Sequence, residues 1–362
     1  MKSLELNFES YSKHEWIEII NKSLKSGSIE EFQWKIDDKV FGESFAHFDD
    51  LKNKPDPLGS NDKVKSWITG IDYSLVPNKE INKLIKNHSK YGLESFIVYA
   101  NESSYDFEDL FRGIEMDKYD IILSTRNGID DILFMERLKD YCIKKQFNHK
   151  KLRLNLRIPD DKPEGMLELY NYLNLNFPEL RYFYRSEREL AHNPVKYLTT
   201  TINSITEFLR ESDLDKDKAI DFLERTKVHF FLTEKFLSGI AMLRTFKIVW
   251  ANYLKAFGAT KLSGRIILGA NHEAFTSDHN TDLIIASLIS MTGAVAGVHS
   301  INISPRETGI ENIEEIMRLF INVQNIMRDE SNMHIVKDAL AGSYAIETAS
   351  NRLAEEVWSN LK

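Results

Sequence analysis

From residue 66 onward, apolar segments of strand length alternate with longer segments of helical periodicity. Eight extended segments are predicted: ESFIVYA (94–100), DIILSTR (120–126), LRLNLRI (152–158), LRYFYRS (180–186), VHFFLTE (228–234), RIILGAN (265–271), HSINIS (299–304) and HIVKDA (334–339). Eight strands separated by helices predict an α/β fold, a (β/α)8 TIM barrel over residues 66–362. A doubly wound open sheet is the alternative, although no Gly-x-Gly-x-x-Gly turn follows the first strand.

Two of the intervening segments have clear helical features. In GIAMLRTFKIVWANYLKAFG (239–258), one apolar stripe repeats at helical spacing through Ile240, Leu243, Phe246, Trp250 and Leu254. The apolar run LIIASLISMTGAVAGV (283–298) is shorter than the roughly 20 residues that a membrane span needs. Its small residues predict a tightly packed internal helix, so no membrane partner is expected.

The strand LRLNLRI predicts a polar barrel interior. Its four apolar residues alternate with Arg153, Asn155 and Arg157, and the apolar face must meet the surrounding helices. Ser300, Asn302 and Ser304 share one face of a later strand in the same way. A polar interior either encloses a polar ligand or is filled by side chains that pair with one another, and Arg153, Arg157 and Arg185 are long enough to fill the axis.

Residues 1–65 are predicted to form an N-terminal helical extension and a linker. Ser12 and Glu15 form a capping box, Trp16 and Ile19 lie on the apolar face of the helix that follows, and Gly27 is suited to close it. A two-stranded piece is predicted around Asp37 and Asp38, and NKPDPLGSND (53–62) is a linker. The apolar face of the helix must be buried on the barrel or on a partner.

Charge and cysteine content exclude several classes of protein. With 47 basic and 55 acidic residues, the net charge of −8 argues against nucleic acid as a partner. The single cysteine, Cys142, excludes an internal disulfide and is predicted to be an ordinary helix residue. The N-terminus has no apolar segment of signal-peptide length, so a cytoplasmic protein is expected.

The closing segment VKDALAGSYAIETASNRLAEEVW (336–358) is predicted to form a buried strand, a Gly-Ser turn and an amphipathic helix. It resembles the last segment of the methylmalonyl-CoA mutase barrel, V-x-D-P-x-G-G-S-x-x-V-E-x-L-T-x-x-L-x-x-x-A-W. Gly342, Ser343, Glu347 and Trp358 match that pattern. Three further segments are similar to the same family: Arg126-Asn127-Gly128, LRTFKIVWANYLKAFG (243–258) and RLFINVQNIMRDESN (318–332). The Glu-Ser-Asn ending of the last of these resembles the small, or beta, subunit of heterodimeric mutases.

The sequence departs from the family where the catalytic subunit carries its chemistry. That subunit has Gly-Tyr-His at the end of its fourth strand, where this chain has Tyr184-Arg185-Ser186-Glu187 and no histidine until His192. Of the family's His-x-Gln-Thr-Ser-Gly, only His272 is retained. No Asp-x-His-x-x-Gly, which carries the lower axial ligand of cobalamin, occurs in the sequence. The resemblance therefore implies that this chain alone binds no cofactor and that adenosylcobalamin enters the assembled enzyme through a partner subunit.

Barrel enzymes place their sites at the carboxyl ends of the strands, and six residues are candidates there. They are Asn127, Glu187, Glu234, His272, Asn302 and Asp338. No catalytic or metal-binding role is assigned to any residue, because His272, Asp278, His279 and Asp282 fit loop and helix-cap positions better than a metal site. His229, within a strand, is predicted to be a hydrogen-bonded interior histidine.

Three functions are compatible with these features. The favoured one is a non-catalytic small subunit of a heterodimeric, adenosylcobalamin-dependent methylmalonyl-CoA mutase, partnered by a large catalytic subunit. The second is a catalytic acyl-CoA mutase barrel that uses a cobalamin domain from a separate chain, which requires an open interior. The third is a stand-alone barrel that binds CoA esters.

Overall fold

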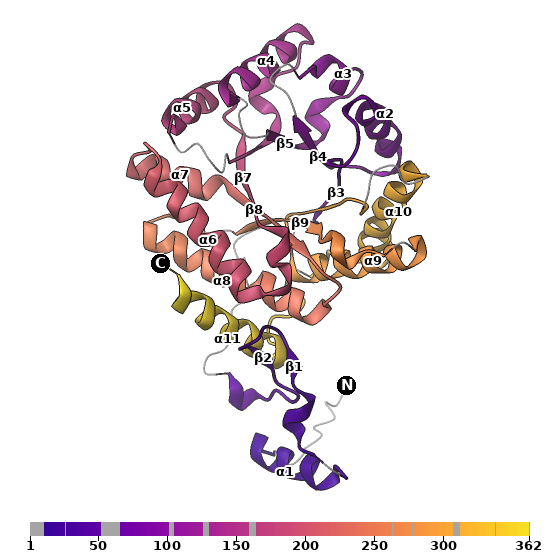
Figure 1. Cartoon of the computed structure of the whole chain (residues 1–362), viewed down its shortest axis with the longest axis vertical. Helices are drawn as coiled ribbons and strands as arrows, with labels where there is room; N and C mark the ends of the chain where they lie inside the picture. The colour runs from indigo at the N-terminus through magenta and orange to yellow at the C-terminus, as the bar shows by residue number, and fades with distance from the viewer. Residues whose placement is uncertain are drawn as a thin grey trace, which may run out of the picture.

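A closed barrel of eight parallel strands, in the order β10-β3-β4-β5-β6-β7-β8-β9, forms the centre of the molecule (Figure 1). The computed structural model describes residues 11–25, 27–51, 66–100, 105–125, 130–158, 164–262, 264–276, 278–306, 312–336 and 338–361. The barrel strands are β3 (Ile68–Asp72), β4 (Ser95–Ala100), β5 (Asp120–Thr125), β6 (Arg153–Arg157), β7 (Arg181–Arg185), β8 (Thr226–Leu232), β9 (Arg265–Ala270) and β10 (Ser300–Ile303). The prediction of a (β/α)8 TIM barrel is confirmed.

Helices surround the barrel in chain order. They are α2 (Asn78–His88), α3 (Phe107–Phe111), α4 (Asp131–Lys144), α5 (Met166–Asn176), α6 (Pro194–Glu211), α7 (Lys216–Arg225), α8 (Phe236–Phe257), α9 (His279–Ala296) and α10 (Ile313–Asn325). Short 3-10 turns are η3 (Ser89–Tyr91), η4 (Met116–Lys118), η5 (His149–Lys151), η6 (Arg188–His192) and η7 (His272–Ala274), and a π-helical turn, η8 (Ile326–Glu330), follows α10. The last helix, α11 (Tyr344–Asn360), packs outside the ring against α8 and α6.

The prediction of one strand was wrong. HIVKDA forms no strand in its described residues, 334–336 and 338–339, and the eighth barrel strand is instead β3, which precedes the predicted first strand. Ile335 and Val336 are each 60% exposed, so these two adjacent apolar residues have no sheet to pack on. β3 pairs with both β10 and β4 and closes the barrel, which leaves no edge for another strand.

The apolar face of each strand packs against the helices. Leu152, Leu154, Leu156 and Ile158 are all buried in the core between barrel and helices, as their alternation predicts. The predicted stripe of α8 is also buried, and Trp250 is fully enclosed. In α9 a Cβ added to Gly293 would lie 2.5 Å from a side-chain atom of Leu268 on β9, so a small residue is needed for this close packing. No helix among the described residues is long and apolar enough to cross a membrane.

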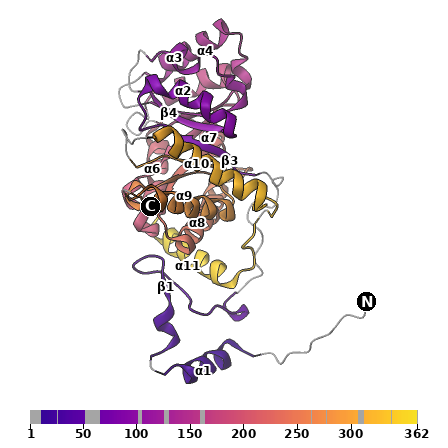
Figure 2. The ribbon, with the colours of Figure 1, turned by 90° about the vertical axis from the view of Figure 1, so that its right-hand side faces the viewer.

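An N-terminal arm, residues 11–51, projects from the barrel beyond α11 (Figure 2). It contains α1 (Lys13–Ser23), η1 (Ile29–Phe32), the antiparallel strands β1 (Trp34–Lys35) and β2 (Phe41–Gly42), and η2 (Phe48–Asp50). The capping box of Ser12 and Glu15 and the two-stranded piece are confirmed. Gly27 has a left-handed φ of +86°, but α1 ends at Ser23, before it. The predicted linker 53–62 lies outside the described residues.

Candidate functional site

The floor of the barrel, at the amino ends of the strands, holds a buried ion pair. The ammonium of Lys227 on β8 lies 3.3 Å from a carboxylate oxygen of Asp120 on β5, and the two residues are 1% and 5% exposed. Asn155 of β6 donates a hydrogen bond to the same carboxylate, and the Nε2 atom of His299 lies 3.7 Å from it. Asn155, from the polar face of LRLNLRI, therefore points into the barrel and contacts Asp120 there.

Cations outnumber carboxylates at this floor. Burial alone would raise the pKa of Asp120, but Lys227 and His299 hold that pKa well below its usual range. Burial, together with the charges of Arg181 and Arg265, lowers the pKa of Lys227 to about 8 against the opposing effect of Asp120. Both pKa values are lowered, which favours the charged form of Asp120 but the neutral form of Lys227, because Lys227 is buried beside two guanidinium groups as well as the carboxylate. The pair is ionised at neutral pH.

The middle of the barrel is filled by apolar side chains. Ile97, Ile122, Phe183 and Ile267 are 0% exposed and form a cluster with Tyr99, apart from the main core. Arg153 does not block the axis, because it is exposed and donates to the backbone oxygen of Lys118 at 2.7 Å. The interior is thus packed, polar at its floor and apolar at its centre.

The mouth of the barrel, at the carboxyl ends of the strands, gathers guanidinium groups on aromatic rings. Arg185, the last residue of β7, lies over the rings of Tyr99 and Phe231 at 5.3 and 5.4 Å. Arg188, in the turn after β7, lies 4.1 Å from the centre of the Phe231 ring. Its Nη1 atom is 2.6 and 2.7 Å from the two ring nitrogens of His272. Stacking on a ring face orients a guanidinium and leaves its edge free to donate hydrogen bonds.

The two histidines of the mouth are neutral. Burial and the charges of Arg188 and Arg185 lower the pKa of His272 to about 3. The same causes hold the pKa of His229 on β8 well below its usual value. Burial raises the pKa of Tyr99 to about 12, so its hydroxyl keeps its proton at neutral pH. The mouth therefore presents cationic and neutral donors.

Three predicted site residues lie at this mouth. His272 follows β9 and contacts both Arg188 and the hydroxyl of Ser304, the latter at 2.9 Å. Glu187 is exposed and lines a pocket of about 650 Å3 beside Arg185 and Arg188. Glu234 is exposed beyond the end of β8. Of the three, only His272 is held by the arginine cluster.

The other three predicted residues do not join them. Asn302 is 0% exposed inside the barrel and donates to the hydroxyl of Ser95, the first residue of β4, so it lies towards the floor. Asp338 pairs with Arg244 of α8, in the layer between α8 and α11, because the strand expected to carry it to the mouth does not form. Asn127 lies outside the described residues.

The structure supports the plainer interpretations of several reactive residues. Asp278 caps α9 by accepting from the Thr281 amide at 2.9 Å, and the described residues contain no group of three or more metal-ligating side chains. Cys142 is buried in α4, and burial raises its thiol pKa to about 12. His229 is interior as predicted, but its ring nitrogens make no hydrogen bond within the described part of the chain, contrary to the prediction.

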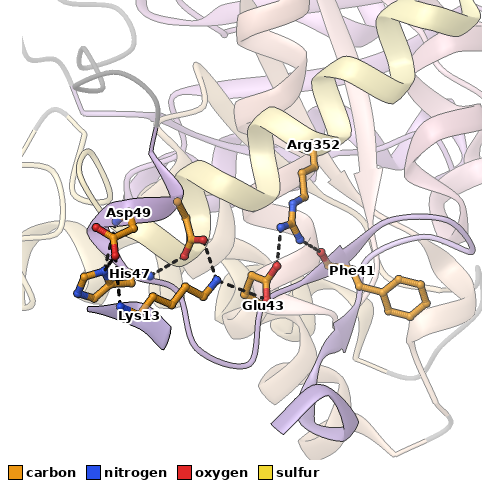
Figure 3. A network of polar contacts seen from close by, with 7 residues as sticks. Lys13, Phe41, Glu43, His47, Asp49 and Arg352 are labelled. Carbon is orange, nitrogen blue, oxygen red and sulfur yellow. Dashed lines mark hydrogen bonds and ion pairs between the residues drawn. The ribbon is translucent and has the colours of Figure 1, made fainter. Parts of the chain in front are cut away.

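The arm and α11 meet in a second polar network (Figure 3). Arg352 of α11 forms an ion pair with Glu43, and Lys13 of α1 lies 3.9 Å from the same carboxylate. Lys13 also pairs with Asp50 at 2.7 Å. The Phe48 ring contacts the Tyr344 ring at 6.3 Å between centroids. These contacts place the arm on α11.

The outer part of the arm buries little apolar surface. α1 contains no buried residue, and Trp16 and Ile19 are 42% and 48% exposed. Trp16 contacts only the edge of the Phe45 ring among the aromatic pairs of the described chain, at 5.8 Å between centroids. Phe32 and Phe48 are more exposed still, at 63% and 64%. The apolar face of α1 is therefore not buried on the barrel.

Sequence reasoning missed several residues of the mouth. Arg185 was predicted only as a possible plug, and its alternation with Phe183 on β7 already indicated that it points inward. Tyr99 could have been assigned inward from its alternation with Ile97. Arg188 lies in a turn, where no periodicity reports the direction of a side chain.

Part of the chain is similar to methylmalonyl-CoA mutases. Residues 186–362 match the family model described as methylmalonyl-CoA mutase. A methylmalonyl-CoA mutase of Cereibacter sphaeroides is 22% identical over 290 residues, which cover 72% of this chain and 40% of that protein. The methylmalonyl-CoA mutase small subunit of Porphyromonas gingivalis is 27% identical over 149 residues, covering 39% of this chain and 24% of that protein. The small subunit of Propionibacterium freudenreichii subsp. shermanii is 26% identical over 138 residues, covering 36% and 21%.

The matched regions thus span 40% or less of the length of each of these relatives. The family match begins at Ser186, directly after β7, and continues through α11. It includes Arg244, Asp338 and Glu347, which meet between α8 and α11. Over residues 186–362, the chain is similar to the methylmalonyl-CoA mutase family.

Proposed function

We propose that this chain is a non-catalytic, structural small subunit of a cytoplasmic, heterodimeric, adenosylcobalamin-dependent methylmalonyl-CoA mutase. In this proposal a large subunit binds adenosylcobalamin and interconverts methylmalonyl-CoA and succinyl-CoA. The observation that carries the proposal is the exposed apolar face of α1, on an arm that projects from the barrel. Two of the relatives are named as small subunits, which supports the same assignment.

The barrel interior supports a scaffold rather than a catalytic barrel. A mutase site inside the barrel requires space for an acyl group, and this axis is filled by Ile97, Ile122, Phe183 and Ile267. After the end of β7, the chain carries the exposed Glu187 and has no histidine until His192. These residues do not fit the acyl-CoA and cobalamin site that the family implies, so we derive no catalytic step on this chain.

The arm is suited to hold a partner without being part of the barrel core. Its inner part is anchored, since Ile29, Ile36 and Val40 are buried and Asp37 accepts from the Val195 amide at 3.0 Å. Its outer helix keeps an exposed apolar face beside charged residues. Aromatic residues on an otherwise polar surface are typical of interface hot spots. Truncating one such side chain costs about 2 kcal/mol or more of binding free energy.

Co-elution of this chain with its large subunit in gel filtration tests the proposal. The mixture should elute as one complex, and Trp16→Ala combined with Ile19→Ala should weaken it at least tenfold by removing apolar contact area. Leu175→Ala is the matched control, because Leu175 is 72% exposed on α5, away from the arm (Figure 1). Separate elution of the unmodified proteins at micromolar concentration would refute the proposal.

A further inference from the structure

Buried polar atoms without partners gather at the barrel mouth. The Nε and Nη2 atoms of Arg188, the hydroxyl of Tyr99 and both ring nitrogens of His229 make no hydrogen bond within the described residues. Folded proteins pair more than about 90% of such atoms, and each one left unpaired costs roughly 1–3 kcal/mol. Donors that are unpaired and close together indicate a place where a polar ligand binds.

These side chains share one location. The Phe231 ring lies 4.1 Å from the Arg188 guanidinium, 5.4 Å from that of Arg185 and 4.3 Å from the His229 ring. The Tyr99 ring lies 5.3 Å from the Arg185 guanidinium. Three strands, β4, β7 and β8, and the turn after β7 therefore direct their donors towards the same point above the apolar cluster.

Cations outnumber carboxylates among the enclosed side chains at this point. Arg185 and Arg188 both act on His229 and His272, whose neutral rings compensate neither cation. Asp72, buried at the end of β3, contributes one carboxylate, and it accepts the Ser74 amide at 2.8 Å. Glu187 and Glu189 lie in the adjoining pocket and are exposed, so among the enclosed groups two guanidinium groups face one carboxylate, which favours an anion at this point.

The shape restricts the size of the anion. Below the arginines, Ile97 and Phe183 close the axis, so a ligand stays at the mouth. To one side, a pocket of about 650 Å3 opens between the ends of β6 and β7 and helix α6. Its charged lining consists of three arginines and four glutamates: Arg157, Arg185, Arg188, Glu187, Glu189, Glu207 and Glu211. This volume accommodates a small molecule whose anionic group meets the arginines.

We propose that Arg185 and Arg188, together with the hydroxyl of Tyr99, form a binding site for a small carboxylate or phosphate anion at the barrel mouth. A guanidinium edge donates two parallel hydrogen bonds to either group, and the aromatic rings hold the two edges in place. The Tyr99 hydroxyl donates a further bond. The site uses residues of this chain alone and does not depend on the proposed partner.

Calorimetric titration of the full chain with inorganic phosphate and, separately, with malonate tests this site. Saturable binding of at least one anion is expected at constant ionic strength, and the tighter of the two identifies the headgroup. Arg188→Gln should weaken binding at least tenfold. Arg153→Gln, an exposed arginine at the opposite end of the barrel, should leave it unchanged. No saturable heat with either anion, or equal binding by Arg188→Gln, would overturn the proposal.

Thermal unfolding separates a binding site from a structural arginine. In anion-free buffer, Arg188→Gln should melt at or above the temperature of the unmodified chain, because a buried charge without full compensation is removed. The bound anion should raise the melting temperature of the unmodified chain but not of the variant. A variant that melts lower and gains as much from the anion would show a purely structural role. Arg185→Gln provides an independent second variant with the same expectations.

Discussion

The barrel and the N-terminal arm are both held by ion pairs between arginine and carboxylate side chains, but these pairs differ in burial. In the barrel and its C-terminal helix, Arg244 is joined to Asp338 and Glu347, and all three side chains are 6% exposed or less. Where the arm meets α11, Arg352 of α11 and Glu43 of the arm form a similar pair with side chains that are 43% and 17% exposed. Water screens the second pair but not the first. Buried pairs fix the barrel, whereas the arm is attached by contacts that cost little to break.

The largest expected effect comes from breaking the buried triad. Arg244→Met removes the buried guanidinium that pairs with Asp338 and Glu347, and we expect a loss of about 3–5 kcal/mol in the free energy of unfolding. Arg352→Met, the matched control at the exposed pair, should cost about 1 kcal/mol or less. Urea unfolding followed by circular dichroism measures both.

The reason for that loss can be tested by a triple replacement. Arg244→Met combined with Asp338→Leu and Glu347→Leu should recover a large part of the stability, because both carboxylates are removed together with their guanidinium partner. Equal losses in Arg244→Met and Arg352→Met would show that burial does not distinguish the two regions.

A smaller effect concerns the pH dependence of stability. Burial and the charge of Lys227 lower the pKa of His299 to about 4, against an ordinary value of about 6.5. Between these values the unfolded chain binds the proton and the folded chain does not, so stability falls as the pH drops from 7 to 4. The contribution of His299 is about 2–3 kcal/mol over that window, at 1.36 kcal/mol for each pKa unit.

His299→Gln should therefore flatten the acid side of the stability profile measured by urea unfolding at several pH values. His14→Gln is the control, because His14 lies on α1 with a side chain that is 83% exposed. A profile that keeps its slope in His299→Gln would show that His299 is protonated in the folded barrel.

The sequence predicted the barrel because the strand and helix periods differ and each strand has one consistent apolar face. It did not identify the correct eighth strand. The short β3 segment contains Gly70 and Asp72, which weaken its strand signal, whereas Ile335 and Val336 have high strand propensity but stay exposed. The pairing of β3 with both β10 and β4 closes the barrel, and this long-range pairing outweighed the local strand propensity of residues 335–336.

The site was predicted less well, for a related reason. His272 was expected at the mouth because it follows a strand, and the structure places it there. Asp338 was expected there from the strand that does not form, and Arg188 was missed because turns have no period. Its stacking on Phe231 joins side chains 43 positions apart in the sequence, which no local pattern reports.

The smallest expected effect on global stability comes from the junction of arm and α11. Glu43→Gln weakens the ion pairs to Arg352 and Lys13, which are partly exposed, so the free energy of unfolding should change by about 1 kcal/mol or less. Hydrogen exchange should nevertheless rise severalfold in α1 and η2, because these elements are attached to α11 through this junction. Glu18→Gln, which removes an exposed charge of α1 that contacts only His14 and Lys22 among the ion pairs of the described chain, should leave exchange unchanged. If amides of β4 and β5 instead exchanged faster together with those of α1, arm and barrel would open as one cooperative unit, and the contrast between the two regions would not hold.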